Sequence, residues 1–189
     1  MKPFIVFLGP PGSGKSTQSK LIADEYGYKR ISTGDLIRDE IKNKTDLGIS
    51  LDPLIQEGLL VPDKYVNHLF HQNLERSLSD HGIVIDGYPR TVSQAEYLDF
   101  HFMEAQYPRM VVYITVDLSI AEQRLLDRNR SDDEARIIET RFIEYEASIS
   151  HVLTHWKEKT IQIDGGKTPE LIYQELQSEI NKRLIKSSP

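Results

Sequence analysis

The chain has 189 residues, no cysteine and a formal net charge of −6. This length suits one compact domain that buries a core without disulfides or metal staples. The lack of cysteine excludes a thiol nucleophile and a Cys-ligated zinc site, and it fits a reducing compartment. The acidic balance argues against general nucleic-acid binding. The apolar run after Lys2 is too short for a signal peptide or a membrane span, so we expect a cytoplasmic protein that binds no membrane.

The first expected element is an apolar strand at 4–8, and the residues that follow it at 9–17 read GPPGSGKST. This is the P-loop pattern, in which glycines let backbone N–H groups approach the phosphates of a nucleotide. Lys15 adds a positive charge near the β- and γ-phosphates, and the Ser16 hydroxyl is able to ligate Mg²⁺. The helix expected over 16–26 points its positive dipole end at the same place. The alternative, a glycine-rich turn without a ligand, is disfavoured by the strand before it and the helix after it.

Further strands are expected where apolar and β-branched residues run together, at 28–31, 83–85, 110–116 and 160–163. Segments with helical periodicity separate them, which indicates an α/β fold: a five-stranded parallel sheet with helices on both faces. Two regions interrupt the alternation. The first offers three helices and no strand, at 33–43, 47–57 and 63–79, and the second, 129–135, is polar apart from Ala135. Both are predicted insertions beside the nucleotide site, at the carboxyl ends of the strands.

The strand at 83–85 is followed by Asp86 and, four residues later, by Arg90. A carboxylate at the end of the strand next to the P-loop strand is where P-loop proteins hold Mg²⁺ or its waters. The alternative for Asp86 is a turn or helix-cap carboxylate before the helix expected from Thr91. Arg90 points toward the same region and suits two-point contact with a phosphate.

An arginine-rich stretch then supplies positive charge, with Arg124, Arg128, Arg130, Arg136 and Arg141. Phosphoryl transfer needs such charge, because negative charge spreads over the oxygens of the moving group. The alternative is that Arg124, Arg128 and Arg136 pair with neighbouring acids on a solvated helix face. We favour that alternative for Arg136, and a functional role for Arg128 and Arg130, which flank the strand-free loop.

Two weaker patterns are excluded. Residues 43–46 read NKTD, like the guanine-recognition motif of GTPases, but they end one expected helix and precede the next instead of following a strand. The histidine pairs His68/His71 and His151/His155 have helical spacing without a third ligand, so no zinc site is expected.

Together these motifs resemble the nucleoside monophosphate kinases, and specifically the adenylate kinase family in a short-lid form, over nearly the whole chain. Residues 31–38, ISTGDLIR, resemble the segment that opens the monophosphate-binding insertion, and 58–63, GLLVPD, the segment that closes it. GYPR at 87–90 followed by TVSQA at 91–95 resembles the family signature. The resemblance implies a P-loop nucleoside triphosphate hydrolase fold and a single kinase domain, 1–189. Its expected parts are a core (1–32, 62–128 and 136–189), a nucleoside monophosphate-binding insertion (33–61) and a short lid (129–135).

The resemblance also implies site residues. The expected ATP contacts are Gly12, Ser13, Gly14, Lys15, Ser16, Thr17, Arg128 and Gly166. The expected AMP contacts are Thr33, Arg38, Leu59, Leu60, Val61, Gly87, Tyr88, Pro89, Arg90, Gln94, Arg130 and Arg141. Within these sets the catalytic residues are Lys15, Arg90, Arg130 and Arg141, and the Mg²⁺ residues are Ser16 and, through water, Asp86.

The chain departs from the family pattern in three places. Ser16 stands where glycine is usual, Tyr88 replaces phenylalanine, and only Asn129 separates Arg128 from Arg130, which shortens the lid. Gln94 alone does not select the base, since its amide complements adenine and, when flipped, guanine; the resemblance favours AMP.

The implied activity is reversible transfer of the γ-phosphoryl group of Mg·ATP to AMP, giving two ADP and serving adenine nucleotide homeostasis. The implied partners are ATP, AMP and ADP, without nucleic acid or membrane, and the implied state is a monomer. The rival hypothesis is a catalytically silent nucleotide sensor. Arg90, Arg130 and Arg141 argue against it, because a binder needs no such charge around the transfer point.

Overall fold

The computed structural model describes residues 4–75, 82–102, 109–130 and 132–186. Five strands form one sheet in the order β2-β3-β1-β4-β5, and every neighbouring pair is parallel. In chain order they are β1 (Phe4–Leu8), β2 (Lys29–Ser32), β3 (Ile83–Asp86), β4 (Arg109–Thr115) and β5 (Thr160–Asp164). The five-stranded parallel sheet predicted from the apolar runs is therefore confirmed.

The helices of the described chain are α1 (Lys15–Tyr26), α2 (Thr33–Lys42), α3 (Asp46–Gln56), α4 (Asp63–Glu75), α5 (Val92–Phe102), α6 (Leu118–Arg128), α7 (Ala135–His155) and α8 (Pro169–Lys186), with a 3₁₀ turn η1 (Lys157–Lys159). The three helices expected within 33–79 are confirmed as far as Glu75, and 76–79 lie outside the described residues. Ser32 and Thr45 cap α2 and α3, because their side chains accept hydrogen bonds from the first turn of each helix.

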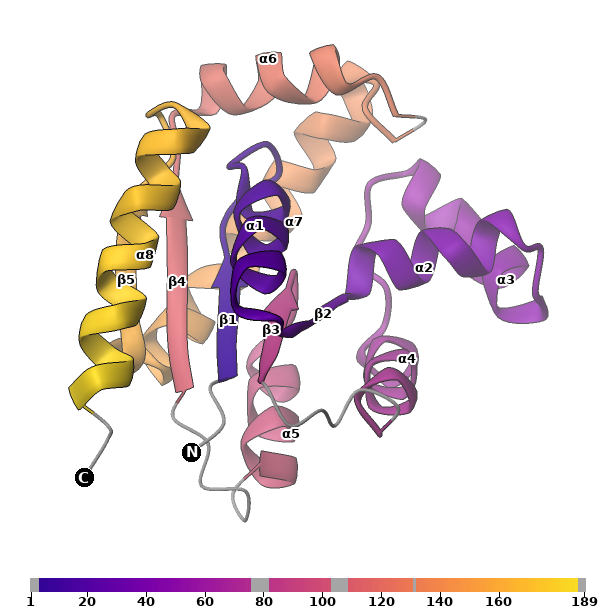
Figure 1. Ribbon diagram of the computed structural model, residues 1–189. Helices are drawn as coiled ribbons and strands as arrows, with labels where there is room; N and C mark the ends of the chain where they lie inside the picture. Colours follow the sequence, from indigo (N-terminus) through magenta and orange to yellow (C-terminus); the bar gives the residue numbers. More distant parts are fainter. Residues whose placement is uncertain (1–3, 76–81, 103–108, 131, 187–189) are drawn as a thin grey trace.

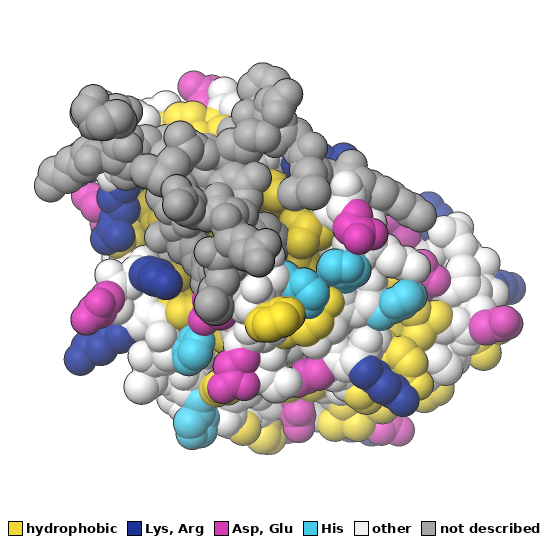
Figure 2. All heavy atoms as spheres, turned by 90° about the horizontal axis from the view of Figure 1, so that it is seen from below, with side chains coloured by type: hydrophobic (Ala, Val, Ile, Leu, Met, Phe, Trp, Pro, Cys, Tyr) yellow, Lys and Arg dark blue, Asp and Glu magenta, His cyan; other side chains and the backbone are white. Residues whose placement is uncertain are grey.

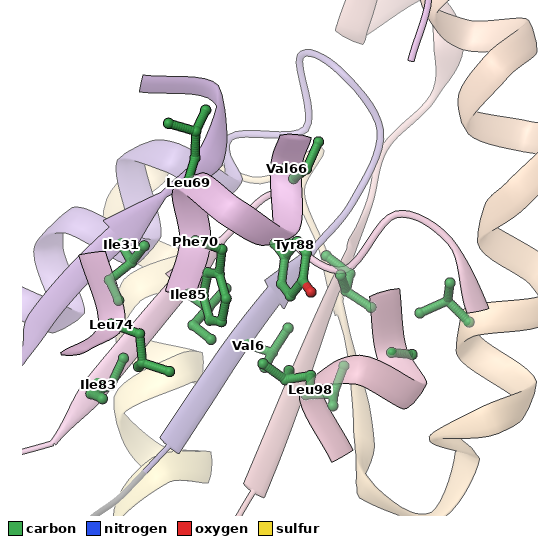
Figure 3. Close-up of a cluster of buried hydrophobic side chains, with 14 of the residues drawn as sticks. Val6, Ile31, Val66, Leu69, Phe70, Leu74, Ile83, Ile85, Tyr88 and Leu98 are labelled. Atoms are coloured by element: carbon green, nitrogen blue, oxygen red, sulfur yellow. The ribbon is translucent and has the colours of Figure 1, made fainter. Parts of the chain in front are cut away.

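Helices cover both faces of the sheet (Figure 1). α1 and α8 lie on one face, α5 and α7 lie on the other, and α6 crosses the carboxyl ends of the strands, while α2 and α3 project beyond the β2 edge. The residues of β1 alternate between two cores: Val6 packs with α4, α5 and α7, and Phe7 packs with α1 and α8. Figure 3 shows the first core, where Val6 lies beside Leu98. A strand buried on both faces reads as a continuous apolar run, which is why the sequence revealed it.

The strand register brings the predicted motifs together at one edge of the sheet. Asp86 is paired with Phe7 of β1 and with Ser32 of β2. The P-loop after β1, the start of α2 after β2 and the segment after β3 therefore emerge side by side. In the part of the chain that the structure describes, no helix has both the length and the apolar character that crossing a membrane requires.

Candidate active site

The P-loop presents an uncapped helix end to its ligand. Gly14, the N-cap of α1, has a left-handed backbone, and no side chain within the described residues caps the first turn, which also lacks acids. The first N–H groups of α1 therefore have no side-chain cap among the described residues, and the positive end of the helix dipole lies behind them. Gly12 is needed for packing: a Cβ there would lie 2.3 Å from the carbonyl oxygen of Ala121 in α6.

Lys15 is the first residue of α1, and its ammonium donates to the carbonyl oxygen of Pro10 over 3.1 Å. Burial lowers its pKa to about 7, the positive charges of Arg90 and Arg141 add to that effect, and Asp86 opposes it. The surroundings of Lys15 thus disfavour its charged form. An anion bound beside Lys15 would restore the ordinary pKa of this lysine.

The pocket around the P-loop, called here the P-loop pocket, is lined by six of the eight residues predicted to contact ATP: Gly12, Gly14, Lys15, Ser16, Thr17 and Arg128. The other two lie elsewhere. Ser13 is buried, and Gly166 lies outside the lining that the described residues form, with its N–H donating to Asp164. Arg130, predicted at the transfer point, also lines this pocket.

Sequence reasoning left Arg124 and Gln18 without a role in this pocket, and the structure places both in its wall. Arg124 donates to the carbonyl oxygen of Gly165 over 2.8 Å, and Gln18 donates to that of Pro169 over 2.9 Å. These bonds hold the chain around the end of β5 against α6 and α1. The signal for Arg124 was its spacing, because residues four apart on one helix, such as Arg124 and Arg128, share a face.

A second pocket, the insertion pocket, lies between the segment at 33–61 and the core. Of the residues predicted to contact AMP, those that line it are Thr33, Arg38, Leu59, Leu60, Val61, Arg90, Gln94 and Arg141. Thr33 is buried and donates from its hydroxyl to the carbonyl oxygen of Gly87 over 3.0 Å, which joins the start of α2 to the signature segment.

A third pocket, the central pocket, connects the other two. It shares Lys15 with the P-loop pocket and shares Arg90 and Arg141 with the insertion pocket. Gly87 and Pro89 line it as well. Burial lowers the pKa of Arg90 to about 10, and the charge of Arg141 contributes. Three cations thus converge where the pockets meet, an arrangement that calls for an anion between them.

Tyr88 of the signature segment is directed into the core instead. Its ring is fully buried and stacks on Phe70, with ring centroids 4.4 Å apart, and its hydroxyl donates to Asn67 over 2.7 Å (Figure 3). Tyr88 does not line the three pockets that the described residues form. The Tyr88 side chain therefore anchors the signature segment to the core.

Asp86 keeps one carboxylate oxygen unpaired within the described chain. Its Oδ2 accepts from Arg30, which also contacts Asp35 over 2.9 Å. Its Oδ1 is buried and has no hydrogen-bond partner among the described residues. A buried, unpaired carboxylate oxygen beside Lys15 fits a water of Mg²⁺, and Ser16 in the P-loop pocket fits as a direct ligand.

No group of three or more His, Cys, Asp and Glu side chains is placed to hold a metal ion in the described ranges. Histidine side chains are visible in Figure 2, on the end of the molecule opposite the carboxyl ends of the strands. His155, predicted on a solvated helix face, is exposed there and contacts Asp99 over 2.7 Å.

The loop between α6 and α7 is organised by Asp133. This buried carboxylate accepts from Arg128 over 2.6 and 2.8 Å, from Arg141 over 3.0 Å and from the N–H of Arg130 over 3.1 Å. The pairing of Arg128 with a nearby acid, considered above for a solvated face, is thus present, with the carboxylate buried and the arginine exposed. Ser131, inside the predicted lid, lies outside the described residues.

Comparisons with known proteins agree with this geometry. Residues 7–161 match the family model described as adenylate kinase. The chain is 33% identical over 179 residues to adenylate kinase 1 of Nostoc sp., which covers 93% of this chain and 97% of the relative. It is 34% identical over 186 residues to the adenylate kinase of Trichodesmium erythraeum, covering 94% and 97%. It is 35% identical over 179 residues to that of a Mycobacterium sp., covering 92% and 97%. The chain therefore belongs to the adenylate kinase family.

Proposed function

We propose that the three connected pockets are one two-substrate site, with the donor nucleotide in the P-loop pocket and the acceptor in the insertion pocket. As a member of its family the chain is a nucleoside monophosphate kinase that interconverts ATP and AMP with ADP. One observation carries the assignment of the two nucleotides to their pockets. The central pocket shares Lys15 with the P-loop pocket, and it shares Arg90 and Arg141 with the insertion pocket.

In this proposal the transferred group passes through the central pocket. The bond from the γ-phosphorus of ATP to its bridging oxygen breaks, and its electron pair leaves with ADP. An oxygen of the AMP phosphate forms the new bond, giving the second ADP. The acceptor phosphate is already ionised near neutral pH, so no general base is needed. The protein aligns the two phosphates and neutralises the charge between them.

Each cation has a part in that alignment. Lys15 and the first N–H groups of α1 hold the donor phosphates. Arg38 and Arg90 hold the acceptor phosphate, and Arg128, Arg130 and Arg141 face the charge that develops during transfer. The insertion at 33–61 and the lid at 129–135 exclude water, which otherwise would turn transfer into hydrolysis.

Mg²⁺ enters with ATP as part of the substrate, and when bound it neutralises charge on the β- and γ-phosphates. Ser16 and Asp86 are the residues we assign to hold it, Asp86 through water. The unpaired Oδ1 of Asp86 supports this assignment.

The assay that tests the proposal measures ADP formed from Mg·ATP with AMP, and then with GMP, UMP and CMP in its place. We expect AMP-dependent ADP formation. The matched variants Arg141→Ala and Arg136→Ala test the site. Both residues lie on α7, and of the two only Arg141 lines the central pocket. Arg141→Ala should lower kcat by about a hundredfold or more, and Arg136→Ala should leave it near the parent value. Nucleotide binding without acceptor-dependent product would leave the silent sensor as the better description.

We further propose that the protein acts as a monomer in the cytoplasm, as the family resemblance implies. The lack of cysteine supports a reducing compartment. Sedimentation velocity tests the monomer, and fractionation of cells that produce the protein tests its location.

A further inference from the structure

The amide of Gln94, in the wall of the insertion pocket, is held on both sides by polar groups of the protein. Its Nε2 donates to Oδ1 of Asp63 over 2.7 Å, and its Oε1 accepts from the N–H of Arg90 over 2.7 Å. Gln94 is only 2% exposed, so these bonds form away from water. Both partners lie outside the helix of Gln94, one at the start of α4 and one in the signature segment.

These partners permit a single orientation of the amide. A carboxylate of Asp63 only accepts hydrogen bonds, and the N–H of Arg90 only donates. If the amide were rotated by half a turn, its oxygen would face the carboxylate and its NH₂ group would face the N–H of Arg90. That state places two acceptors and two donors against each other in a buried position, which is costly.

A second set of bonds holds Asp63 in place. Its Oδ2 accepts from the hydroxyl of Thr91 over 2.9 Å, and the same hydroxyl accepts from the N–H of Gln94 over 3.2 Å. Asp63, Thr91 and Gln94 thus close a ring of hydrogen bonds around the start of α5. Asp63 is also the acidic residue in the first turn of α4, where a carboxylate is favoured by the helix dipole.

After these bonds, Gln94 has one N–H and one oxygen lone pair left to offer a ligand. Adenine presents the complementary pair, since its N6 amino group donates and its ring N1 accepts. Guanine and hypoxanthine present the reverse pair, an oxygen at position 6 and an N–H at position 1, and they would require the flipped amide. The two groups that oppose the flip, the Asp63 carboxylate and the Arg90 N–H, therefore separate the two classes of base.

We infer that Asp63 is a specificity-determining residue, which together with the N–H of Arg90 fixes the Gln94 amide in the orientation that reads adenine and rejects 6-oxopurines. The inference rests on the proposed function, in which the insertion pocket holds the acceptor nucleotide. Asp63 is a positioning residue, because it acts through Gln94. Asp63 thus resolves the choice between adenine and guanine, which Gln94 alone leaves open.

The test is Asp63→Asn, whose amide is able to turn and so to donate as well as accept. Both orientations of Gln94 then find a partner at residue 63, and only the N–H of Arg90 still opposes the flip. The readout is kcat/KM with AMP, GMP and IMP as acceptors. IMP is the sharpest probe, because hypoxanthine has the 6-oxo edge of guanine without its 2-amino group. We expect the AMP-to-IMP ratio of kcat/KM to fall by about tenfold or more, with IMP gaining.

Asp46→Asn is the matched control, since it removes an acid from the first turn of α3 just as Asp63→Asn does from α4. It should leave the AMP-to-IMP ratio unchanged. A merely structural role of Asp63 would lower kcat/KM for AMP and IMP alike, and that result would overturn the inference. If Asp63→Asn does not fold by circular dichroism, Asp63→Ser carries the test: a hydroxyl both donates and accepts, so residue 63 no longer opposes the flip and the ratio should shift in the same direction.

The two proposals fail in different ways. If the parent protein forms no ADP with AMP, the proposed function is wrong. If it does so, and Asp63→Asn keeps the parent AMP-to-IMP ratio, only the role of Asp63 is wrong.

Discussion

Arg128 and Asp133 form a two-point ion pair: Nε of the arginine donates to Oδ2 over 2.8 Å and Nη2 donates to Oδ1 over 2.6 Å. Asp133 also accepts from Arg141, which lines the central pocket. One carboxylate therefore positions two arginines that reach different pockets. The flat two-point geometry fixes the guanidinium plane of Arg128, which a lone contact would leave free to turn.

Asp133→Asn should lower both kcat and stability. Burial alone would raise the pKa of Asp133, but its bonds to Arg128 hold the pKa below the ordinary value. The stabilisation is thus fully present above the unfolded pKa of about 4, and it is lost as the pH falls through the folded pKa. We expect the unfolding free energy to drop by roughly 1–3 kcal/mol near neutral pH. Urea unfolding measures it, and the parent and variant curves should converge in acid. A constant difference at every pH would contradict this role.

Lys15→Met should lower turnover by several orders of magnitude without harming the fold. The ammonium holds donor phosphates in the proposed mechanism, so its loss should lower kcat by about a thousandfold or more. The pKa of Lys15 is about 7 in the folded protein and higher in the unfolded chain. The charged ammonium therefore lowers the unfolding free energy of the parent, fully below pH 7 and less and less as the pH rises toward the unfolded pKa. The variant should therefore be at least as stable as the parent near neutral pH. Near-parent activity would show that the P-loop assignment is wrong.

Local patterns predicted the fold and the walls of the pockets. Strands such as β3 are buried on both faces and read as apolar runs, and the P-loop needs glycines and a lysine at fixed spacing. The pattern of 87–90 marked a segment that lines the central pocket, yet it did not reveal that the ring of Tyr88 points into the core. A motif names the position of a residue, and the packing around it decides where the side chain goes.

The partners of the site residues were not predictable in the same way. Gln94 meets Asp63 across 31 positions of the chain, and Asp86 meets Arg30 across 56. No sequence periodicity indicates either pairing, because both arise from the way the strands and the insertion pack. Asp133 lies close to Arg128 in sequence, but an acid near an arginine looks the same on a solvated surface as in a buried network.

Gly12→Ala should weaken ATP binding far more than Gly27→Ala. Both glycines have positive φ, +77° and +64°, so both variants bear left-handed strain of about 1–2 kcal/mol. Only at Gly12 would the new Cβ meet backbone, at 2.3 Å from the carbonyl oxygen of Ala121, whereas nothing lies within 4 Å at Gly27. The P-loop or α6 must then shift. Calorimetric titration with Mg·ATP measures the difference, and equal losses of affinity in the two variants would mean that the contact with α6 is not needed.

Binding of Mg·ATP should be accompanied by proton uptake at mildly alkaline pH. In the ligand-free protein the pKa of Lys15 is about 7, so near pH 8 most molecules carry a neutral Lys15. Donor phosphates beside it favour the charged form and raise that pKa toward its ordinary value, so the lysine gains a proton on binding. Near pH 6 it is already charged, and uptake by Lys15 should vanish. Calorimetry in buffers of different ionisation enthalpy counts the protons, with Lys15→Met at saturating nucleotide as the control. Equal uptake by parent and variant near pH 8 would assign the proton to another group.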